Sequence, residues 1–263
     1  MNLHVDVSGL VPEARPVVGA AAALYLRYTE PWFVGLLAHG SAVKGGFIPG
    51  CSDIDLQLYL DDDAFSEDGQ LPFELLVALH ADLARIDPAP FQYIQCYPFG
   101  SRLRDGWVGP IPGAYRLLAG RLPFPEATAD QLRASAQQAL VDLRPVQEHL
   151  TGALIEHSVG GVALARHLRL LCTEVWPTLY HVLTLREGDS VGVWALPKPE
   201  AIGMLSADQP LGATIRAFHD ALWVHYGGAE TTQGALDCIA KGVAFLRAAK
   251  EWFAESAGRV SGG

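Results

Sequence analysis

Hydrophobic and polar residues alternate strictly along DIDLQLYL, residues 53–60. A strand places successive side chains on opposite faces, so this stretch predicts a β-strand with one polar and one apolar face. The apolar run from Phe33 to Ala38 predicts a second, buried strand that ends at Gly40-Ser41. FQYIQCY, residues 91–97, predicts a third strand, and the glycine-rich VKGGFIPGCS predicts a loop between the first two.

Helical spacing of apolar residues accounts for most of the remaining chain. Helices are predicted over residues 13–29 and 71–86, beside the strands. A segment rich in Gly and Pro, residues 98–125, follows, and within it YRLLAG predicts a short helix. Beyond it, helices are predicted over 129–150, 152–186, 209–226 and 232–255, and Pro197-Lys198-Pro199-Glu200 opens another. We therefore expect an α+β chain, with a mixed sheet and helices over 1–125 and an all-helical domain over 126–263.

Composition narrows the functional classes. The chain has 263 residues, half of them hydrophobic, and a formal net charge of −10. A nucleic-acid backbone requires clustered Lys and Arg, so we expect no nucleic-acid partner. The acidic surface suits a cationic small molecule, although acidity also keeps proteins soluble. We find no apolar run long enough for a membrane span and no secretory signal, which predicts no membrane partner and a cytoplasmic location.

The four cysteines lie far apart, at 51, 96, 172 and 238, with no Cys-x-x-Cys pair. This spacing favours reduced thiols over a zinc site or a disulfide scaffold.

The polar face of the 53–60 strand begins with two acids, Asp53 and Asp55. Their Cα atoms are expected about 6.6 Å apart, and two like charges at that distance on a half-buried sheet repel each other. A divalent cation relieves the repulsion, and Mg²⁺ binds through one or two carboxylates together with substrate phosphates. A lone Asp-x-Asp motif is weak evidence for a metal site. Hydrolases with an aspartate nucleophile have the motif Asp-x-Asp-x-Thr, and Gln57 at the fifth position does not fit it.

Three residues near the first strand complete this pattern. Gly40 permits a sharp turn and a close approach of phosphate to the main chain. The Ser41 hydroxyl can donate to phosphate oxygens, and Lys44 can add a positive charge.

The segment GSAVKGGFIPGCSDIDL resembles the signature of the nucleotidyltransferase superfamily, which has a polymerase-beta-like fold. The pattern is most similar to bacterial aminoglycoside adenylyltransferases of the streptomycin/spectinomycin type, and ALPKPEAI resembles the Lys-x-x-Ala segment of that family. The resemblance implies a nucleotidyltransferase domain followed by a helical domain, with ATP and the acceptor between them. It also implies that Gly40 and Ser41 hold the triphosphate, Asp53 and Asp55 bind Mg²⁺ and act in catalysis, and Lys198 reaches a phosphate.

The chain departs from the family at the third strand, where such enzymes commonly place a third carboxylate as base. FQYIQCY contains no acid, and Gln92 or Gln95 stands at that position. An amide cannot accept a proton at neutral pH. Either Glu74 or Asp105 replaces the acid, the base is supplied differently, or transfer is lost.

A few other residues have both a functional and a structural interpretation. His39 can touch a phosphate or can simply pack at the strand end, and Trp107 and Tyr115 can stack on a ligand or anchor their loop. Glu174, near Arg166 and Arg169, can face the cleft and bind an ammonium group, or all three can be surface charges.

Three functions remain open. The first is Mg²⁺-dependent transfer of AMP from ATP to a hydroxyl of a small, aminoglycoside-like acceptor, which is an antibiotic-resistance activity. The alternative is a non-catalytic nucleotide- or ligand-binding protein of the same fold. A third has a tyrosine or serine of a partner protein as acceptor. The acceptor, the number of metals and the oligomeric state are left open by the sequence.

Overall fold

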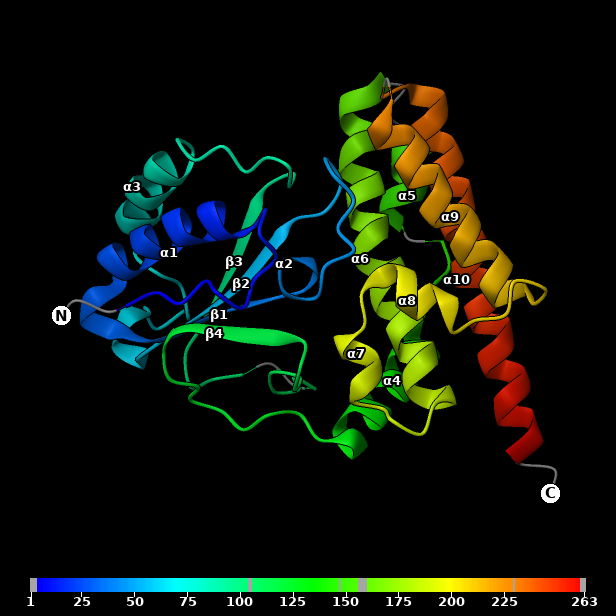
Figure 1. Ribbon diagram of the computed structural model, residues 1–263, viewed down its shortest axis with the longest axis horizontal. Coiled ribbons are helices and arrows are strands. Elements are labelled where there is room, and N and C mark those ends of the chain that lie inside the picture. Colours follow the sequence, from blue (N-terminus) through cyan, green and yellow to red (C-terminus); the bar gives the residue numbers. More distant parts are fainter. Residues whose placement is uncertain (1–3, 104–105, 147, 156–159, 229, 261–263) are drawn as a thin grey trace. The chain divides into compact units, whose positions relative to one another are not determined.

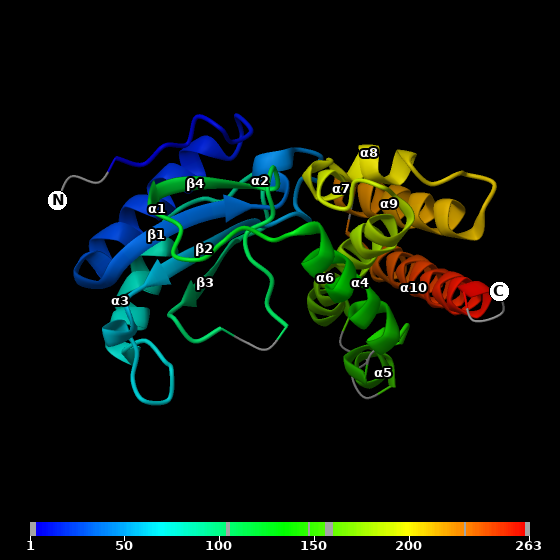
Figure 2. The same ribbon diagram turned by 90° about the horizontal axis from the view of Figure 1, so that it is seen from below.

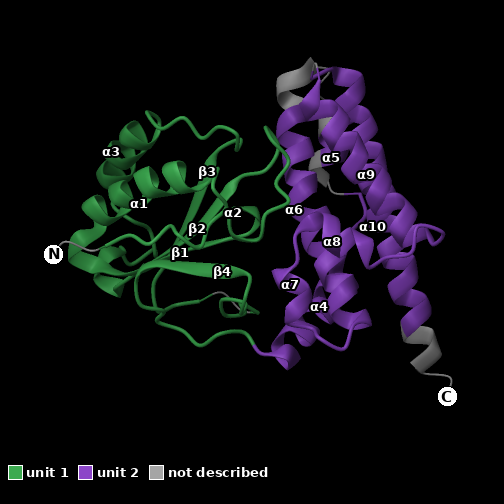
Figure 3. Cartoon of the chain, viewed as in Figure 1, with its two compact units in different colours: residues 1–127 green, residues 128–263 purple. Residues whose placement is uncertain are grey.

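The computed structural model describes residues 4–103, 106–146, 148–155, 160–228 and 230–260 (Figure 1). The chain divides into two compact units, Met1–Ala127 and Thr128–Gly263, which are coloured separately in Figure 3. Unit 1 contains a mixed sheet with helices, and unit 2 is helical. The predicted α+β fold class is therefore confirmed.

The sheet of unit 1 has four strands in the order β3-β2-β1-β4, which can be followed from edge to edge in Figure 2. The strands are β1 (Phe33–His39), β2 (Ile54–Leu60), β3 (Ile94–Phe99) and β4 (Tyr115–Gly120). β1 pairs antiparallel with both β2 and β4, whereas β2 and β3 are parallel.

The YRLLAG segment is strand β4, so the prediction of a short helix there is wrong. Its six residues are too few to show a period, and antiparallel pairing along β1 decides the conformation. The first strand, the β2 alternation and the third strand are found where the sequence predicts them, although β3 begins only at Ile94.

One face of the sheet is covered by helices α1 (Arg15–Thr29) and α3 (Phe73–Leu83). The apolar half of the β2 alternation, Ile54, Leu56 and Leu58, is at most 2% exposed in this core. Helix α1 buries Val18 and Ala22 against it, and the chain continues from Thr29 directly into the short helix η1 over Glu30–Trp32. The two acids of the alternation consequently lie on the opposite face of the sheet.

The far end of that opposite face is covered by aromatic side chains. Tyr59 contacts Phe99 and Phe124, with ring centroids 5.7 and 5.8 Å away. Trp107 packs on Phe124 at 5.3 Å and on Phe99 at 6.2 Å. These aromatic side chains cover the end of the face where β2 ends, and the two acids lie at the other end, where β2 begins.

Unit 1 also contains the short helices η1 (Glu30–Trp32), α2 (Ser41–Lys44) and η2 (Asp62–Ala64). The described part of unit 2 contains seven α-helices. These are α4 (Ala129–Asp142), α5 (Glu148–Ile155), α6 (Gly160–Arg186), α7 (Gly192–Ala195), α8 (Lys198–Gly203), α9 (Pro210–Gly227) and α10 (Thr232–Val260). The predicted helix over 129–150 is interrupted, because α4 ends before Arg144-Pro145 and a new helix starts at Glu148.

Helix α6 is the centre of unit 2, and α4 and α10 pack against it. Its buried residues include Leu168, Leu171, Val175 and Leu179. From α10, Lys250 donates its Nζ hydrogens to the carbonyl of Val141 at 2.6 Å, which caps the C-terminal end of α4. Among the described residues, no helix is long and apolar enough to cross a membrane.

Candidate functional site

The bend that follows β1 brings Gly40 against the carboxylate of Asp55. Gly40 has φ +71° and ψ −147°, a conformation that side-chain-bearing residues rarely adopt. A Cβ atom placed on Gly40 would lie 2.7 Å from Oδ2 of Asp55. The absence of a side chain at this position therefore makes room for the carboxylate.

Asp55 is the centre of a row of polar residues that crosses the sheet. In the strand register, Asp55 lies opposite His39 of β1 and Gln95 of β3, and His39 lies opposite Tyr115 of β4. We call these four residues the polar row. Residues paired in register project from the same face, so the polar row contributes one side chain from each strand to the uncovered face.

Asp53 lies directly before β2 and is held by a phenol. The hydroxyl of Tyr93 donates to Oδ2 of Asp53 at 2.7 Å, and it lies 3.5 Å from Oε1 of Gln95. The amide of Gln95 in turn donates to the hydroxyl of Tyr97. The single hydroxyl hydrogen of Tyr93 goes to Asp53, and this bond fixes the orientation of the first acid of the pair.

Tyr93 was missed by the sequence prediction, which treated FQYIQCY only as a strand without an acid. The alternation itself contains the signal, since Tyr93, Gln95 and Tyr97 are two residues apart and share a face. A tyrosine in such a segment is usually a packing residue, so its contact with Asp53 could be identified only from the structure.

The question of which glutamine replaces the third acid has a geometrical answer. Gln95 pairs with Asp55, whereas Gln92 lies before β3 and donates its main-chain N–H to the carbonyl of Ser52 at 2.8 Å. Glu74 lies in the first turn of α3, on the helix-covered side of the sheet, and does not reach this face. Asp105 lies outside the described residues.

The first turn of α2 supplies Ser41 and Lys44, which follow Gly40 directly. Ser41 is buried at 6% exposure, and Lys44 is half-buried at the end of the same short helix. Burial lowers the pKa of His39 to about 4. The charge of Asp53 opposes this shift, and the positive charge of Lys44 adds to it. His39 is therefore neutral at pH 7, and its buried Nε2 has no hydrogen-bond partner among the described residues.

Trp107 and Tyr115 both have structural roles in this unit. Trp107 belongs to the aromatic cover of the sheet described above. Tyr115 donates its hydroxyl to Oε1 of Glu126 at 2.7 Å, and burial together with this carboxylate raises the pKa of Tyr115 to about 12.

Lys198 belongs to unit 2 and opens helix α8. Its Nζ lies over the ring of Trp176, 5.4 Å from the centroid, which is a cation–π distance. The structure thus brings together Gly40, Ser41, Lys44 and the two acids within unit 1. That Lys198 reaches the same ligand stays a prediction.

The donor set suits a magnesium ion that shares its coordination with a ligand. No group of three or more His, Cys, Asp and Glu side chains that could hold a metal occurs in the described part of the chain. Two half-buried carboxylates are nevertheless what Mg²⁺ uses when phosphates supply the remaining oxygens. The space that a Cβ on Gly40 would fill adjoins one of these carboxylates. The residues present therefore fit a metal–nucleotide complex and do not fit a metal held by protein alone.

Replacing Gly40 with alanine is expected to lower the free energy of unfolding by about 3 kcal/mol, because the new Cβ combines a positive φ with a clash against Asp55. Gly69 is a matched control, since it has the same φ of +71° but nothing within 4 Å of an added Cβ. Gly69→Ala is expected to cost about 1 kcal/mol. Urea unfolding of both variants measures the difference, and equal losses would show that Asp55 does not occupy this space.

Comparison with known proteins supports the fold only. No family model matches the chain, and no curated protein matches its sequence. Among solved structures, the chain is similar to the crystal structure of spectinomycin adenyltransferase AAD(9) from Enterococcus faecialis with ATP and spectinomycin. The TM-score is 0.52 at 13% sequence identity, over 88% of this chain and 98% of that chain. The predicted resemblance to a nucleotidyltransferase is thereby confirmed as a resemblance of fold.

Proposed function

We propose that the chain transfers a nucleotidyl group, AMP from ATP, to a hydroxyl of a small acceptor. The observation that carries the proposal is the contact between Gly40 and the Asp55 carboxylate, on a fold shared with an adenyltransferase. This contact places a turn suited to phosphate beside an acid suited to magnesium. Asp53, oriented by Tyr93, would supply the second carboxylate.

In the proposed reaction, the acceptor oxygen attacks the α-phosphorus of ATP. The bond to the bridging oxygen of the β-phosphate breaks, pyrophosphate leaves, and the acceptor proton passes to a base. When bound, Mg²⁺ would neutralise negative charge on the phosphates. Asp53 and Asp55 would hold it, and Gly40, Ser41 and Lys44 would position the triphosphate.

The helical unit has its own part in this proposal. Lys198, whose Nζ lies over the ring of Trp176, would contribute a positive charge to a phosphate. The similar adenyltransferase structure contains spectinomycin, which supports an aminoglycoside-like acceptor and a role in antibiotic resistance. Residues 1–125 would then be the nucleotidyltransferase domain and 126–263 the domain that closes over the substrates.

The test is a calorimetric titration of ATP into the full chain, with Mg²⁺ and with EDTA. Without the cation, the two acids repel the triphosphate, so the affinity is expected to fall by at least about tenfold. The same affinity in both buffers would contradict the proposal.

A pyrophosphate-release assay over a panel of aminoglycoside and spectinomycin-type acceptors then separates catalysis from binding. Turnover with one acceptor supports transfer. Mg²⁺-dependent ATP binding without pyrophosphate release from any acceptor would leave the non-catalytic binding protein as the better description.

A further inference from the structure

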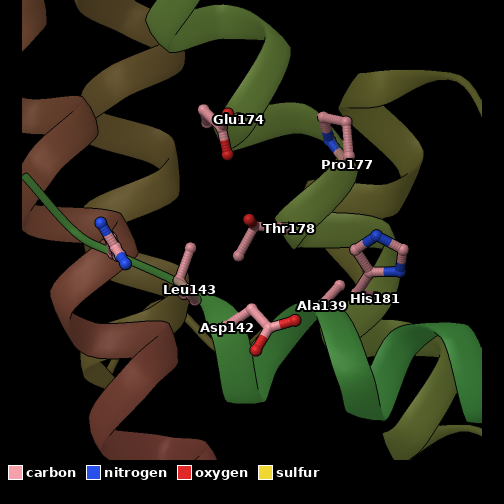
Figure 4. Close-up of a pocket in the computed structure, with 8 residues that line it drawn as sticks. Ala139, Asp142, Leu143, Glu174, Pro177, Thr178 and His181 are labelled. Carbon is pink, nitrogen blue, oxygen red and sulfur yellow. The ribbon is translucent and has the colours of Figure 1, made fainter. Parts of the chain in front are cut away.

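A pocket within the helical unit lies where the C-terminal end of α4 meets the middle of α6. Its volume is about 420 Å³, and all of its lining residues belong to unit 2 (Figure 4). It is thus a separate feature from the polar row of unit 1. The side chains that determine its chemistry are Asp142, Arg144, Glu174, Pro177, Thr178 and His181.

Glu174 places a carboxylate in this pocket that forms no ion pair with the lining residues that the structure describes. No hydrogen bond or ion pair joins Glu174 to any other residue that the structure describes, and Figure 4 shows the carboxylate directed into the pocket. Burial raises the pKa of Glu174. A half-buried carboxylate without an ion pair is partly desolvated, and a bound cation would offset this cost.

Thr178, one turn further along α6, is an independent indication of a ligand. The residue is 5% exposed and lines the pocket, and its hydroxyl points toward Glu174 in Figure 4. Two other buried helical threonines behave differently, since Thr29 and Thr184 each donate to the carbonyl four residues earlier at 2.7 Å. The Thr178 hydroxyl makes no such bond and has no partner in the described structure, which leaves it available to a bound molecule.

The remaining wall of the pocket also favours positive charge. Asp142 adds a second carboxylate at the rim, where it accepts a hydrogen bond from Gln138 at 2.8 Å. Burial lowers the pKa of His181 to about 4, so this side chain carries no charge at pH 7. Arg144 is the one cation among the lining residues that are described, against two acids.

We propose that this pocket binds a small organic cation through its ammonium groups. Glu174 would form the ion pair, and Thr178 would accept or donate a hydrogen bond beside it. Asp142 at the rim would favour compounds that carry more than one positive charge. The pocket shares no lining residue with the proposed nucleotide-binding set, and the inference goes beyond the proposed transfer reaction.

The test is a calorimetric titration of spermidine into the full chain at pH 7, without nucleotide. The parent is expected to bind it saturably at one site, and N-acetylation of its amines is expected to abolish binding. Glu174→Gln is expected to weaken binding by at least about tenfold, because it removes the charge and keeps the shape. Thr178→Val is expected to weaken it by about fivefold and keeps the buried packing, so it remains informative if the first variant folds poorly.

An acidic protein also attracts a polyamine without a specific site, so a control variant with the same change in net charge is needed. Glu251→Gln removes the same charge from an exposed position on α10 and is expected to change the affinity by less than about twofold. Equal weakening by Glu174→Gln and Glu251→Gln, or no saturable binding by the parent, would overturn the proposal. Since spermidine binding is measured without ATP, its failure and a failure of the ATP titration are separate results.

Discussion

Replacing Asp55 with asparagine is expected to weaken Mg²⁺-dependent ATP binding by roughly a hundredfold, or about 2.8 kcal/mol. The amide keeps the size of the side chain next to Gly40, so the bend is expected to persist. The negative charge is lost from the centre of the polar row, and a neutral oxygen binds Mg²⁺ far more weakly than a carboxylate does. Calorimetric titration with Mg²⁺ and ATP measures the change.

Asp63 provides the matched control for this variant. It is an exposed acid shortly after β2, and Asp63→Asn changes the net charge by the same amount. Its affinity for ATP is expected to stay within about twofold of the parent. If Asp55→Asn behaved like Asp63→Asn, the metal-binding role of Asp55 would have to be abandoned. A melting curve of each variant excludes general unfolding as the cause.

Replacing Gln95 with glutamate is expected to destabilise the fold in the absence of Mg²⁺ but not in its presence. Gln95 lies opposite Asp55 in the parallel register, so the variant places two carboxylates side by side. Without metal, their repulsion is expected to lower the free energy of unfolding by about 1 kcal/mol. With Mg²⁺ the third carboxylate becomes a further ligand, and the loss of stability is expected to disappear.

The same variant addresses the source of the base. A carboxylate can accept the acceptor's proton, and general-base catalysis typically contributes about a hundredfold or more to a rate. Pyrophosphate release by Gln95→Glu is therefore expected to exceed that of the parent by that order. Gln95→Met, which has similar length and no charge, serves as the control. Equal rates in the glutamate and methionine variants would show that no base acts from this position.

The fold was predictable wherever the local pattern and the tertiary environment agree. In β2 the alternation of Asp-Ile-Asp-Leu matches a sheet with one covered face, and the structure buries Ile54 and Leu56 completely. The YRLLAG strand was not predictable in this way, because its conformation depends on pairing with β1, more than seventy residues earlier. The gap between α4 and α5 could have been expected from Pro145, which disfavours helix in the residue before it.

The candidate site shows the same division. The sequence suggested Gly40 and Asp55 separately, but their contact depends on the antiparallel register of β1 and β2. It could not distinguish Gln95 from Gln92, because only strand pairing shows which of the two lies beside Asp55. The roles of these residues in binding stay predictions. The pocket around Glu174 joins two helices distant in sequence, and no local pattern encodes it.

The period of two in β2 has a consequence for how this chain tolerates mutation. Substitutions at single positions of the strand alter either the acidic face or the apolar core. Inserting or deleting one codon between Cys51 and Asp55 would instead shift the pairing of every later position with β1, directing carboxylates inward and leucines outward. The number of residues in this stretch is therefore more constrained than the identity of most of its amino acids.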